Sequence, residues 1–537
     1  MQVPRLILAG AFLCALTAAR AAQDEEPWKP GFDSIAEKDI EGHLWRIAAP
    51  RNEGRDSPSQ GMKLAGDYII EVFERSGVEP GWDKGYRHPY TAKPRGGWSL
   101  PEPENCKLTV SDGDEASELE FGTDFVPFPG CNGRGTGSVV FLGYGIASKR
   151  YNDLGKRSYK GKVAMILWGE PRHKRVLKGP EVSQFADAYA KLEELEERGC
   201  SGVLMVRRAP PATAVRSQGK KEPLAPPKLG YRYTWGSWQG TATTGWTRPR
   251  ARTKIPVAEI TEELATRILG KDIVKLAEKI DKAGKSKRIE LKKVTVSLST
   301  ATTSNEGVLE VDNVFGVLRG TDERLREEYV IIGSHYDHVG VDHWSRIGYG
   351  ADDNGSGTVA NLELVEALAK NPPRRSIVFA FFGSEEDGLI GSHKFAEDLP
   401  FLDEDERSPA SVVAMLNMDM LGRGDAKECV VLGTRENPAL GKVLKKANKL
   451  AKTGVKKVTT GKAAELWERS DHYSFHEHDI PVLFFFESAS ISDNADYHTF
   501  RDTIDGLSLP KIANSARLVY ATAWLLANAD TRPPGPR

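Results

Sequence analysis

Four unbroken apolar runs in the C-terminal half of the chain constrain its fold more than any other feature. They occupy residues 329–332, 376–382, 411–416 and 480–486. Apolar runs without polar alternation are typical of strands that are covered on both faces. Segments with helical spacing lie between them, as at Val359, Leu362, Val365 and Leu368. Strands that alternate with helices predict an α/β fold with a largely parallel sheet.

Imidazole and carboxylate side chains follow each of these runs, and two more carboxylates lie in a glycine-flanked turn. In chain order the candidate metal ligands and their acidic neighbours are His335, Asp352, Asp353, Glu385, Glu386, Asp419 and His498. Ligands of open α/β sheets bind outside the carboxyl ends of the strands. Imidazole and carboxylate are the donors that a zinc-type cation takes when no thiolate is offered. The sequence therefore predicts a metal site at one edge of the sheet.

The adjacent pair Glu385–Glu386 is the most informative of these groups. Two neighbouring carboxylates repel each other unless a cation or a proton lies between them. If one of them binds a metal, the other stays free to act as a general base on water. Asp337, two residues after His335, is a carboxylate that can hold the imidazole in one tautomer.

Two other motifs suggest different chemistry but are less well supported, and a third, the nucleophile elbow of serine hydrolases, is absent. The segment from Asp352 to Glu363 matches the spacing of a calcium-binding EF-hand loop, but no entering helix and no second loop accompany it. His472 and His476 have the i, i+4 spacing of helical zinc ligands, without the glutamate of the metalloprotease helix. A Gly-x-Ser-x-Gly nucleophile elbow is absent from the sequence.

The first 21 residues have the form of a secretory signal. A short apolar segment follows Arg5, and Ala19-Arg20-Ala21 offers a cleavage site between small residues. The segment is too short to span a bilayer, and no later run is long enough, so a water-soluble, secreted or periplasmic protein without a membrane span is expected. Of the cysteines beyond Cys14, Cys106 and Cys131 form a disulfide, or all four are isolated thiols.

The composition is that of an ordinary globular protein with more than one domain. A chain of 537 residues exceeds what a single core usually holds. With 74 basic and 75 acidic residues, nothing in the charge favours nucleic acid as a partner. A loop rich in Pro, Gly and Arg carries five aromatic residues between 231 and 246, which either cover a substrate cleft or pack on their own module.

The ordered set of motifs resembles the catalytic domain of the co-catalytic di-zinc aminopeptidases, a family that also includes glutamate carboxypeptidase and the glutaminyl cyclases. The motifs are Gly333-Ser-His-Tyr-Asp337, Gly350-Ala-Asp-Asp-Asn-Gly-Ser-Gly357, Glu385-Glu386, Asn417-Met-Asp419 and Tyr497-His-Thr499. The resemblance covers residues 31–82 and 305–528. The segment between them, with Gly143-Tyr-Gly-Ile146 and Lys160-Gly-Lys-Val163, more loosely resembles an inserted protease-associated domain.

This resemblance implies a fold and a domain layout. The fold is a three-layer α/β/α zinc-exopeptidase domain with a mixed, mostly parallel sheet, plus a small β-rich inserted domain. The expected layout is a signal peptide at 1–21, the N-terminal part of the peptidase domain at 22–104, the insertion at 105–300, the main peptidase domain at 301–530 and a tail at 531–537.

The resemblance also implies the role of each site residue. Asp353 bridges two zinc ions about 3.5–4 Å apart; His335 and Asp419 complete one ion, and Glu386 and His498 the other. Glu385 is the general base on a bridging hydroxide, Asp337 orients His335, and Tyr497 stabilises the oxyanion. The expected activity is removal of N-terminal residues from peptide substrates. A carboxypeptidase, a glutaminyl cyclase and an inactive binding protein remain alternatives, and the oligomeric state is open.

Overall fold

The structure of this chain is a computed structural model that describes residues 26–534 with several gaps. The gaps are residues 93–98, 129, 172, 174–184, 186–187, 207–214, 218–219, 223–252, 305–308, 342–346, 404, 406, 461–465 and 495. The expected signal peptide and the aromatic loop at 231–246 lie outside the described residues, so both expectations stay predictions.

The larger of the two main sheets is mixed, and its central strands are parallel. Among the described residues it has nine strands, in the order β1-β15-β17-β16-β18-β21-β19-β20, with β2 also paired to β15. The bounds are β1 Glu79–Pro80, β2 Arg87–Ala92, β15 Leu309–Leu318, β16 Tyr329–His335, β17 Ser376–Phe382, β18 Val412–Met418, β19 Glu428–Leu432, β20 Lys457–Thr460 and β21 Val482–Phe486. The four apolar runs of the sequence form the adjacent strands β17, β16, β18 and β21, which pair in parallel. Antiparallel strands β15 and β19 flank them.

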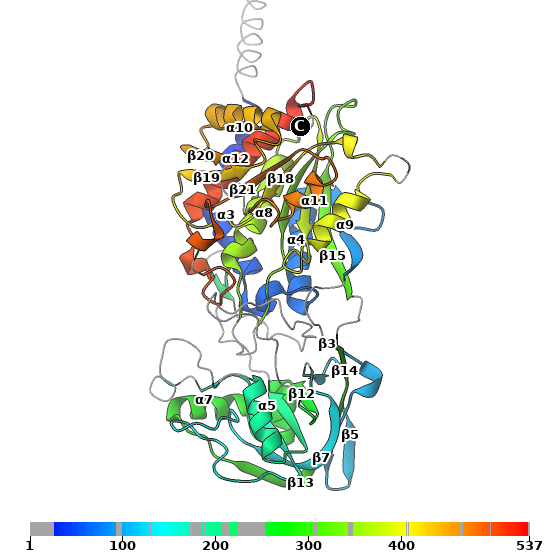
Figure 1. The fold of residues 1–537 in the computed structure, drawn as a ribbon, viewed down its shortest axis with the longest axis vertical. Helices are drawn as coiled ribbons and strands as arrows, with labels where there is room; N and C mark the ends of the chain where they lie inside the picture. The colour runs from blue at the N-terminus through cyan, green and yellow to red at the C-terminus, as the bar shows by residue number, and fades with distance from the viewer. Residues whose placement is uncertain are drawn as a thin grey trace, which may run out of the picture.

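Helices cover both faces of this sheet and confirm the three-layer α/β/α architecture (Figure 1). One face packs against α2 Lys29–Ser34, α3 Glu37–Ile47, α4 Gln60–Ser76, α8 Gly357–Ala369, α10 Pro438–Ala451 and α12 Leu509–Asn528. The other packs against α9 Ile390–Asp398 and α11 His472–His476. Alternate side chains of β17 enter the two cores, with Phe379 and Phe381 on one face and Val378 and Phe382 on the other.

A second sheet, built from the chain between Lys107 and Thr300, has cores of its own. Its order within the described residues is β5-β4-β13-β7-β8-β9-β12-β6. The strands are β4 Lys107–Asp112, β5 Glu115–Glu118, β6 Phe125–Pro127, β7 Gly133–Phe141, β8 Lys162–Leu167, β9 Gly202–Val206, β12 Val257–Ile260 and β13 Ile289–Thr300. Helix α5 (Ala188–Glu197) contributes to the core on one face, and α6 (Glu262–Leu269) and α7 (Ile273–Ala283) to the core on the other.

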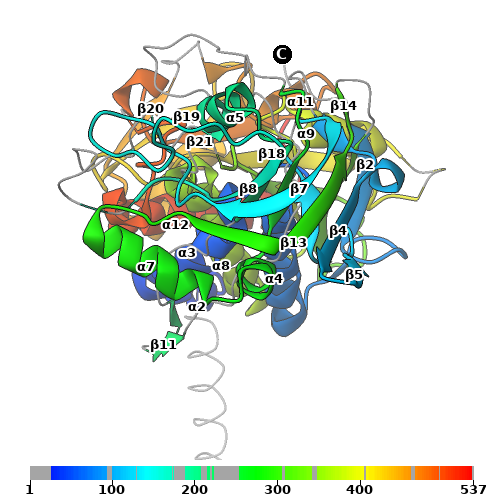
Figure 2. The ribbon, with the colours of Figure 1, turned by 90° about the horizontal axis from the view of Figure 1, so that it is seen from below.

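The two bodies lie end to end in Figure 1, and Figure 2 shows the second sheet in front of the first. The two-stranded pair of β3 (Ser99–Pro101) and β14 (Thr302–Ser304) lies where the chain enters and leaves the second body. This arrangement agrees with an insertion between 105 and 300, whereas its exact boundaries and its protease-associated identity stay predictions.

Two further expectations concern the membrane and the cysteines. Within the part of the chain that the structure describes, no helix combines the length and apolar character needed to cross a bilayer. Cys106, Cys131, Cys200 and Cys429 are buried and free, so the alternative of a Cys106–Cys131 disulfide is not realised.

Candidate metal centre

The predicted ligands come together at the carboxyl ends of the parallel strands. His335 is the last residue of β16, Glu385 and Glu386 follow β17, Asp419 follows β18, and His498 lies in the loop after β21. Asp353 comes from the helical turn Ala351–Ser356 that leads into α8. Each strand delivers its polar residue where its buried apolar part ends, and the parallel pairing places these ends at one edge.

The ligands form two groups that share Asp353. In the first group, His335 Nε2 lies 3.4 Å from Asp353 Oδ1 and 3.4 Å from Asp419 Oδ1. In the second, His498 Nε2 lies 3.0 Å from Asp353 Oδ2 and 2.9 Å from Glu386 Oε2. The two oxygens of Asp353 thus face two separate sets of donors. The resemblance implied the same two groups of side chains, and their role as metal ligands stays a prediction.

The donor atoms are oriented toward one another rather than toward hydrogen-bonding partners. His335 Nε2, His498 Nε2 and Asp419 Oδ1 are buried and make no hydrogen bond within the described residues. Polar atoms left unpaired in a protein interior are costly, and one cation in each group would satisfy all three atoms. Two imidazoles and three carboxylates are a donor set that suits zinc-type cations, so the residues fit a pair of such ions.

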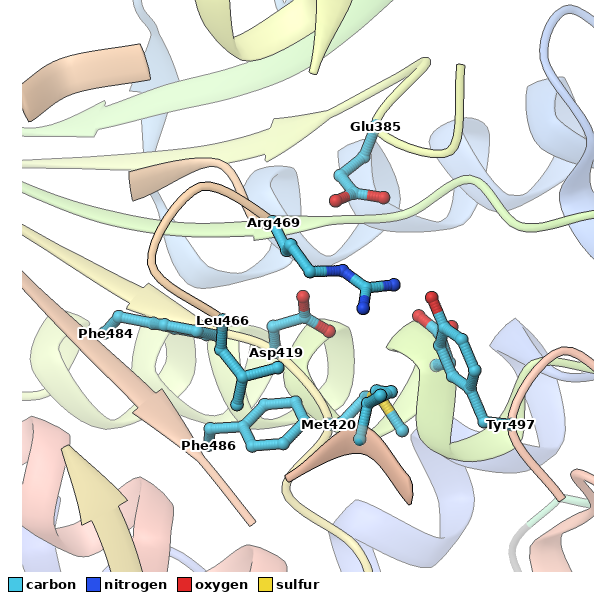
Figure 3. A pocket seen from close by; sticks show the side chains of 10 residues that line it. Glu385, Asp419, Met420, Leu466, Arg469, Phe484, Phe486 and Tyr497 are labelled. Carbon is cyan, nitrogen blue, oxygen red and sulfur yellow. The ribbon is translucent and has the colours of Figure 1, made fainter. Parts of the chain in front are cut away.

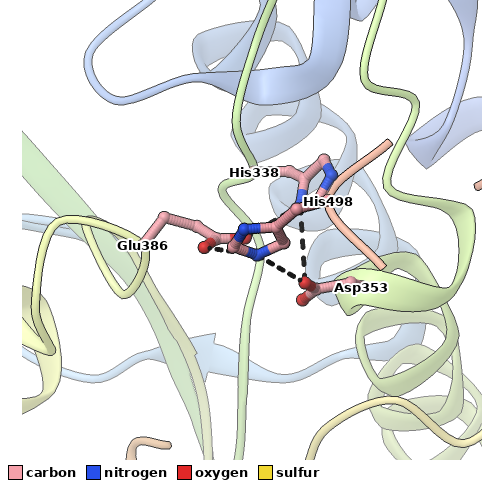
Figure 4. A group of neighbouring side chains, drawn as sticks. All are labelled: His338, Asp353, Glu386 and His498. Atoms are coloured by element: carbon pink, nitrogen blue, oxygen red, sulfur yellow. Dashed lines mark hydrogen bonds and ion pairs between the residues drawn. The ribbon is translucent and has the colours of Figure 1, made fainter. Parts of the chain in front are cut away.

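His338 is a fourth member of the second group that the sequence reasoning missed (Figure 4). Its Nδ1 lies 2.9 Å from Glu386 Oε1, and its ring packs edge-on against that of His498. Burial lowers the pKa of His338, although Glu386 opposes this, so the neutral ring can donate from Nδ1 to the carboxylate. The sequence feature that could have indicated His338 as a site residue is its position directly after Asp337.

Glu385 lies beside the first group but belongs to neither. Its Oε2 is 3.9 Å from His335 Nε2, the longest of the contacts of that imidazole with a carboxylate here. Burial raises the pKa of Glu385 well above its ordinary value, and the neighbouring charge of Glu386 adds to this against the opposing effect of His335. For Glu386, burial acts in the same direction, but His498 and His338 lower its pKa to about 2. The two adjacent carboxylates therefore differ in their environment.

Asp337 contacts both ligand-bearing loops. Its Oδ1 lies 3.6 Å from His335 Nδ1 and accepts a hydrogen bond from the backbone N–H of Glu385. Its Oδ2 accepts hydrogen bonds from the backbone N–H of Glu386 and from the hydroxyl of Ser57. A single buried carboxylate thus links the end of β16 to the loop after β17.

Other buried polar residues hold the remaining loops, and sequence reasoning did not identify them. Asp502 accepts hydrogen bonds from the backbone N–H groups of Asp352 and Asp353 at 3.0 Å each. Ser470 donates a 2.8 Å hydrogen bond to Asp419 Oδ2. Each partner is distant in sequence from the residue that it binds, so no local pattern could have found these contacts.

Arg55 connects the N-terminal segment to the same loops. Its guanidinium is fully buried and donates to the backbone carbonyls of Tyr336, Tyr349 and Gly350 at 2.8 Å and of Ile47 at 3.1 Å. Burial lowers the pKa of Arg55 to about 10, which leaves it charged at neutral pH. Gly350 has a φ of 55°, and a Cβ there would lie 2.4 Å from His338 Cγ, so this turn requires glycine.

A pocket with both apolar and charged walls opens beside the ligands (Figure 3). Its apolar walls are Met420, Leu466, Phe484, Phe486 and Ile491. Asp353, Glu385 and Asp419 line it on the side of the metal centre. Tyr497 stacks on the ring of His498 at 3.8 Å, and Figure 3 shows its hydroxyl directed toward the pocket.

Four arginines lie near the ligand loops: Arg346, Arg423, Arg469 and Arg501. Of the three that the structure describes, Arg469 has no carboxylate partner within the described residues. Its side chain extends into the pocket in Figure 3. Arg423 pairs with Asp352, Asp496 and Asp502, and Arg501 pairs with Asp496. Arg346 lies outside the described residues.

The competing motifs do not form metal sites of their own. Glu363, which would be the last ligand of an EF-hand, contacts His43 and the backbone of Ala36 rather than Asp352. His472 stacks on Phe484 at 4.3 Å, and its pKa is lowered to about 3 by burial. Neither His472 nor His476 joins a cluster of metal-ligand atoms in the described part of the chain.

Replacing His338 with alanine is expected to weaken zinc binding about 10–100-fold, because partners that orient a ligand contribute that much to metal affinity. His338→Asn, which keeps a donor near the position of Nδ1, should retain part of the affinity. Zinc dissociation constants from competition with a chelator check this. His393→Ala is the matched control, because His393 is 41% exposed and belongs to neither group. Equal affinities for His338→Ala and this control would contradict the role.

Comparison with known proteins places part of the chain in a described family. Residues 313–523 match the sequence model of peptidase family M28. A protein of Arthroderma otae named "Probable leucine aminopeptidase" is 32% identical over 213 residues, which are 38% of this chain and 56% of that protein. "Probable aminopeptidase YDR415C" of Saccharomyces cerevisiae is 31% identical over 214 residues, 38% of this chain and 54% of that protein. The chain thus spans about half the length of these relatives.

Solved structures resemble the chain over most of its length, at low identity. A zinc aminopeptidase from Bacillus subtilis is 18% identical, with 93% of this chain and 97% of that chain covered, at a TM-score of 0.44.

Proposed function

Since residues 313–523 belong to peptidase family M28, we propose that this chain is a zinc-dependent aminopeptidase that removes N-terminal residues from peptides. The observation that carries the proposal is the pair of donor groups that share Asp353, with Glu385 beside them and outside both. A site of this form supports water attack on a carbonyl, with one carboxylate reserved for proton transfer.

The metal ligands that we propose are those predicted from the sequence. His335, Asp353 and Asp419 hold one zinc ion, and Asp353, Glu386 and His498 hold a second. A zinc pair supplies Lewis acidity toward the scissile carbonyl and the attacking water. His338 orients Glu386 through their 2.9 Å contact, and Asp337 orients His335 and the backbone of the Glu385–Glu386 loop.

Glu385 acts as the general base and then as the general acid in this proposal. It takes a proton from the attacking water and returns it to the leaving amine. Its carboxylate lines the pocket and has His335 as its nearest imidazole, at 3.9 Å. Tyr497, whose hydroxyl faces the same pocket, donates a hydrogen bond to the oxyanion that develops on the carbonyl.

The pocket and the relatives favour an aminopeptidase with a preference for apolar residues. The walls formed by Met420, Leu466, Phe484, Phe486 and Ile491 suit an apolar side chain at the substrate's N-terminus. Both curated relatives described above are named as aminopeptidases, one of them for leucine. The peptide's first side chain therefore enters this pocket, and its carbonyl lies over the metal centre.

A panel of three substrates tests the proposed function. Leucine p-nitroanilide is expected to be hydrolysed, whereas N-acetyl-leucine p-nitroanilide and an N-acetylated dipeptide with a free C-terminus are not. The N-acetyl group removes only the ammonium, so the first two substrates form a matched pair. Release of the C-terminal residue from the blocked dipeptide alone would overturn the aminopeptidase assignment.

Arg469 favours a carboxypeptidase as the second candidate function. An unpaired guanidinium in the pocket can bind a substrate carboxylate through charge-assisted hydrogen bonds. If the blocked dipeptide is the substrate, Arg469→Met should raise its KM about 10–100-fold, the usual range for hydrogen bonds to charged groups. Glutaminyl cyclisation at a single zinc ion is less favoured, because the donor set for two ions is complete.

The location of the protein follows from its N-terminus in this proposal. The apolar segment after Arg5 and the cleavage site at Ala19-Arg20-Ala21 direct the chain to a secreted or periplasmic location. The substrates are then peptides outside the cytoplasm.

A further inference from the structure

A second cluster of potential metal ligands lies where two separate parts of the chain meet. His43 is on α3, Tyr68 and Arg75 are on α4, and Glu363 and Glu366 are on α8. Helices α3 and α4 precede the second sheet in the chain, and α8 follows it. We call His43, Glu363 and Glu366 the seam cluster, because they join these two parts of the peptidase domain.

The ligand atoms of the seam cluster face one another without hydrogen bonds between them. His43 Nε2 lies 3.7 Å from Glu363 Oε1 and 3.9 Å from Glu366 Oε1. The side chains of His43 and Glu363 are 4% and 3% exposed, and that of Glu366 is 30% exposed. These distances are too long for hydrogen bonds and match the spacing of atoms around a shared cation.

An unpartnered carboxylate oxygen points into the cluster. Glu363 Oε2 accepts a hydrogen bond from the backbone N–H of Ala36, but Glu363 Oε1 is buried and makes no hydrogen bond within the described residues. A buried carboxylate oxygen without a partner needs a proton or a cation to be stable. Burial accordingly raises the pKa of Glu363 to about 8.

The imidazole of His43 is in the state that a metal ligand requires. Burial, together with the charge of Arg75, lowers the pKa of His43 to about 3, so the ring is neutral at physiological pH. Its Nδ1 lies 2.7 Å from the hydroxyl of Tyr68. If Nδ1 donates a hydrogen bond to that hydroxyl, the lone pair of Nε2 points toward the two glutamates. This is the usual arrangement of a metal-binding histidine.

The two arginines at the cluster have carboxylate partners. Arg75 donates to Glu366 Oε1 at 2.6 Å, and Arg46 donates to Glu71 at 3.1 Å. Arg75 therefore fixes the position of Glu366 through Oε1, the oxygen that lies 3.9 Å from His43 Nε2, so a cation would bind Oε2 or share Oε1 with the guanidinium. A divalent cation would displace the proton of Glu363, and the carboxylates of Glu363 and Glu366 would then face the cation together.

We propose that His43, Glu363 and Glu366 bind one divalent cation of zinc type, separate from the candidate metal centre, which fastens α3 to α8. An imidazole donor favours zinc over calcium, which takes oxygen ligands. We assign the cation a structural role, because none of the three residues lines the pocket beside the candidate metal centre. The inference does not depend on the proposed catalytic function.

Zinc content measured by elemental mass spectrometry after equilibrium dialysis tests this proposal. Glu363→Gln is expected to bind about one zinc ion per chain fewer than the wild type. The same difference is expected between Asp353→Asn and the double variant Asp353→Asn/Glu363→Gln. Asp353 belongs to the candidate metal centre, so any zinc lost from that centre lowers both members of the second pair equally and leaves their difference intact. If the centre binds no zinc, Asp353→Asn should match the wild type and the difference should still be about one ion. Excess calcium should not reduce the difference.

Glu71→Gln is the matched control, because it removes a carboxylate from the same neighbourhood that pairs with Arg46 and Arg75 but is outside the cluster. Its zinc content should equal that of the wild type. Zinc-edge anomalous scattering from wild-type crystals is the second measurement, with a peak expected within coordination distance of His43 Nε2. No difference in zinc content, or no such peak, would overturn the proposal and show that Glu363 holds a proton instead.

Discussion

Replacing Glu385 with glutamine is expected to lower kcat about 10²–10⁴-fold while the bound zinc stays at the wild-type level. Glutamine has the shape of glutamate but cannot accept the proton of the attacking water at neutral pH. Glu385 is outside both donor groups, so its replacement removes no ligand. The backbone N–H of residue 385 keeps its hydrogen bond to Asp337, and the loop should stay in place. Steady-state kinetics and metal analysis on the same sample measure both quantities.

Glu386→Gln is the matched control for this experiment. It makes the same chemical change one residue away, but Glu386 belongs to the second donor group and contacts His498 at 2.9 Å. This variant should therefore lose zinc as well as activity. Retained turnover in Glu385→Gln would place the general base elsewhere, and loss of zinc in that variant would make Glu385 a ligand.

Removal of the metal with 1,10-phenanthroline is expected to abolish hydrolysis, and added zinc is expected to restore it. The fully buried donors His335, Asp353 and Asp419 would then face one another without a cation. Loss of the bound metal also removes the free energy of unfolding that metal binding adds to the folded state. The melting temperature should accordingly fall on chelation and recover with zinc.

Asp353→Asn tests the same centre without a chelator. Because each oxygen of Asp353 faces a different donor group, this single change should weaken both zinc sites. Its zinc content should fall by more than that of Asp419→Asn, which belongs to one group only. Activity that is indifferent to phenanthroline, or an Asp353→Asn variant with full zinc content, would remove the metal hypothesis.

The strands of the peptidase domain could be predicted because burial on both faces leaves a local pattern. The runs at 329–332, 376–382, 411–416 and 480–486 became β16, β17, β18 and β21, which are neighbours in one sheet. The antiparallel strands at its margins could not be placed in the same way. β15 and β19 owe their direction to pairing with strands that are distant in the chain, which no local pattern records.

The residues that support the ligands could not be predicted from the sequence. Asp502 is 149 residues from the backbone N–H of Asp353 that it binds, and Arg55 is 295 residues from the Gly350 carbonyl. His338 is adjacent to Asp337 in sequence, yet only the bend after β16 turns its ring toward Glu386. Such contacts depend on how separate loops pack, so the identity of the side chain alone does not reveal them.

By itself the sequence determined which donor atoms are available and that each lies at the end of a buried strand, because both properties are local to a few residues. Only the tertiary structure decided how the donors divide about Asp353, which arginine stays unpaired in the pocket, and that His43 meets Glu363 across 320 positions of chain. The physical reason is that coordination and ion pairing act over a few ångströms in space. Distances of that kind are set by the packing of helices and loops around the sheet.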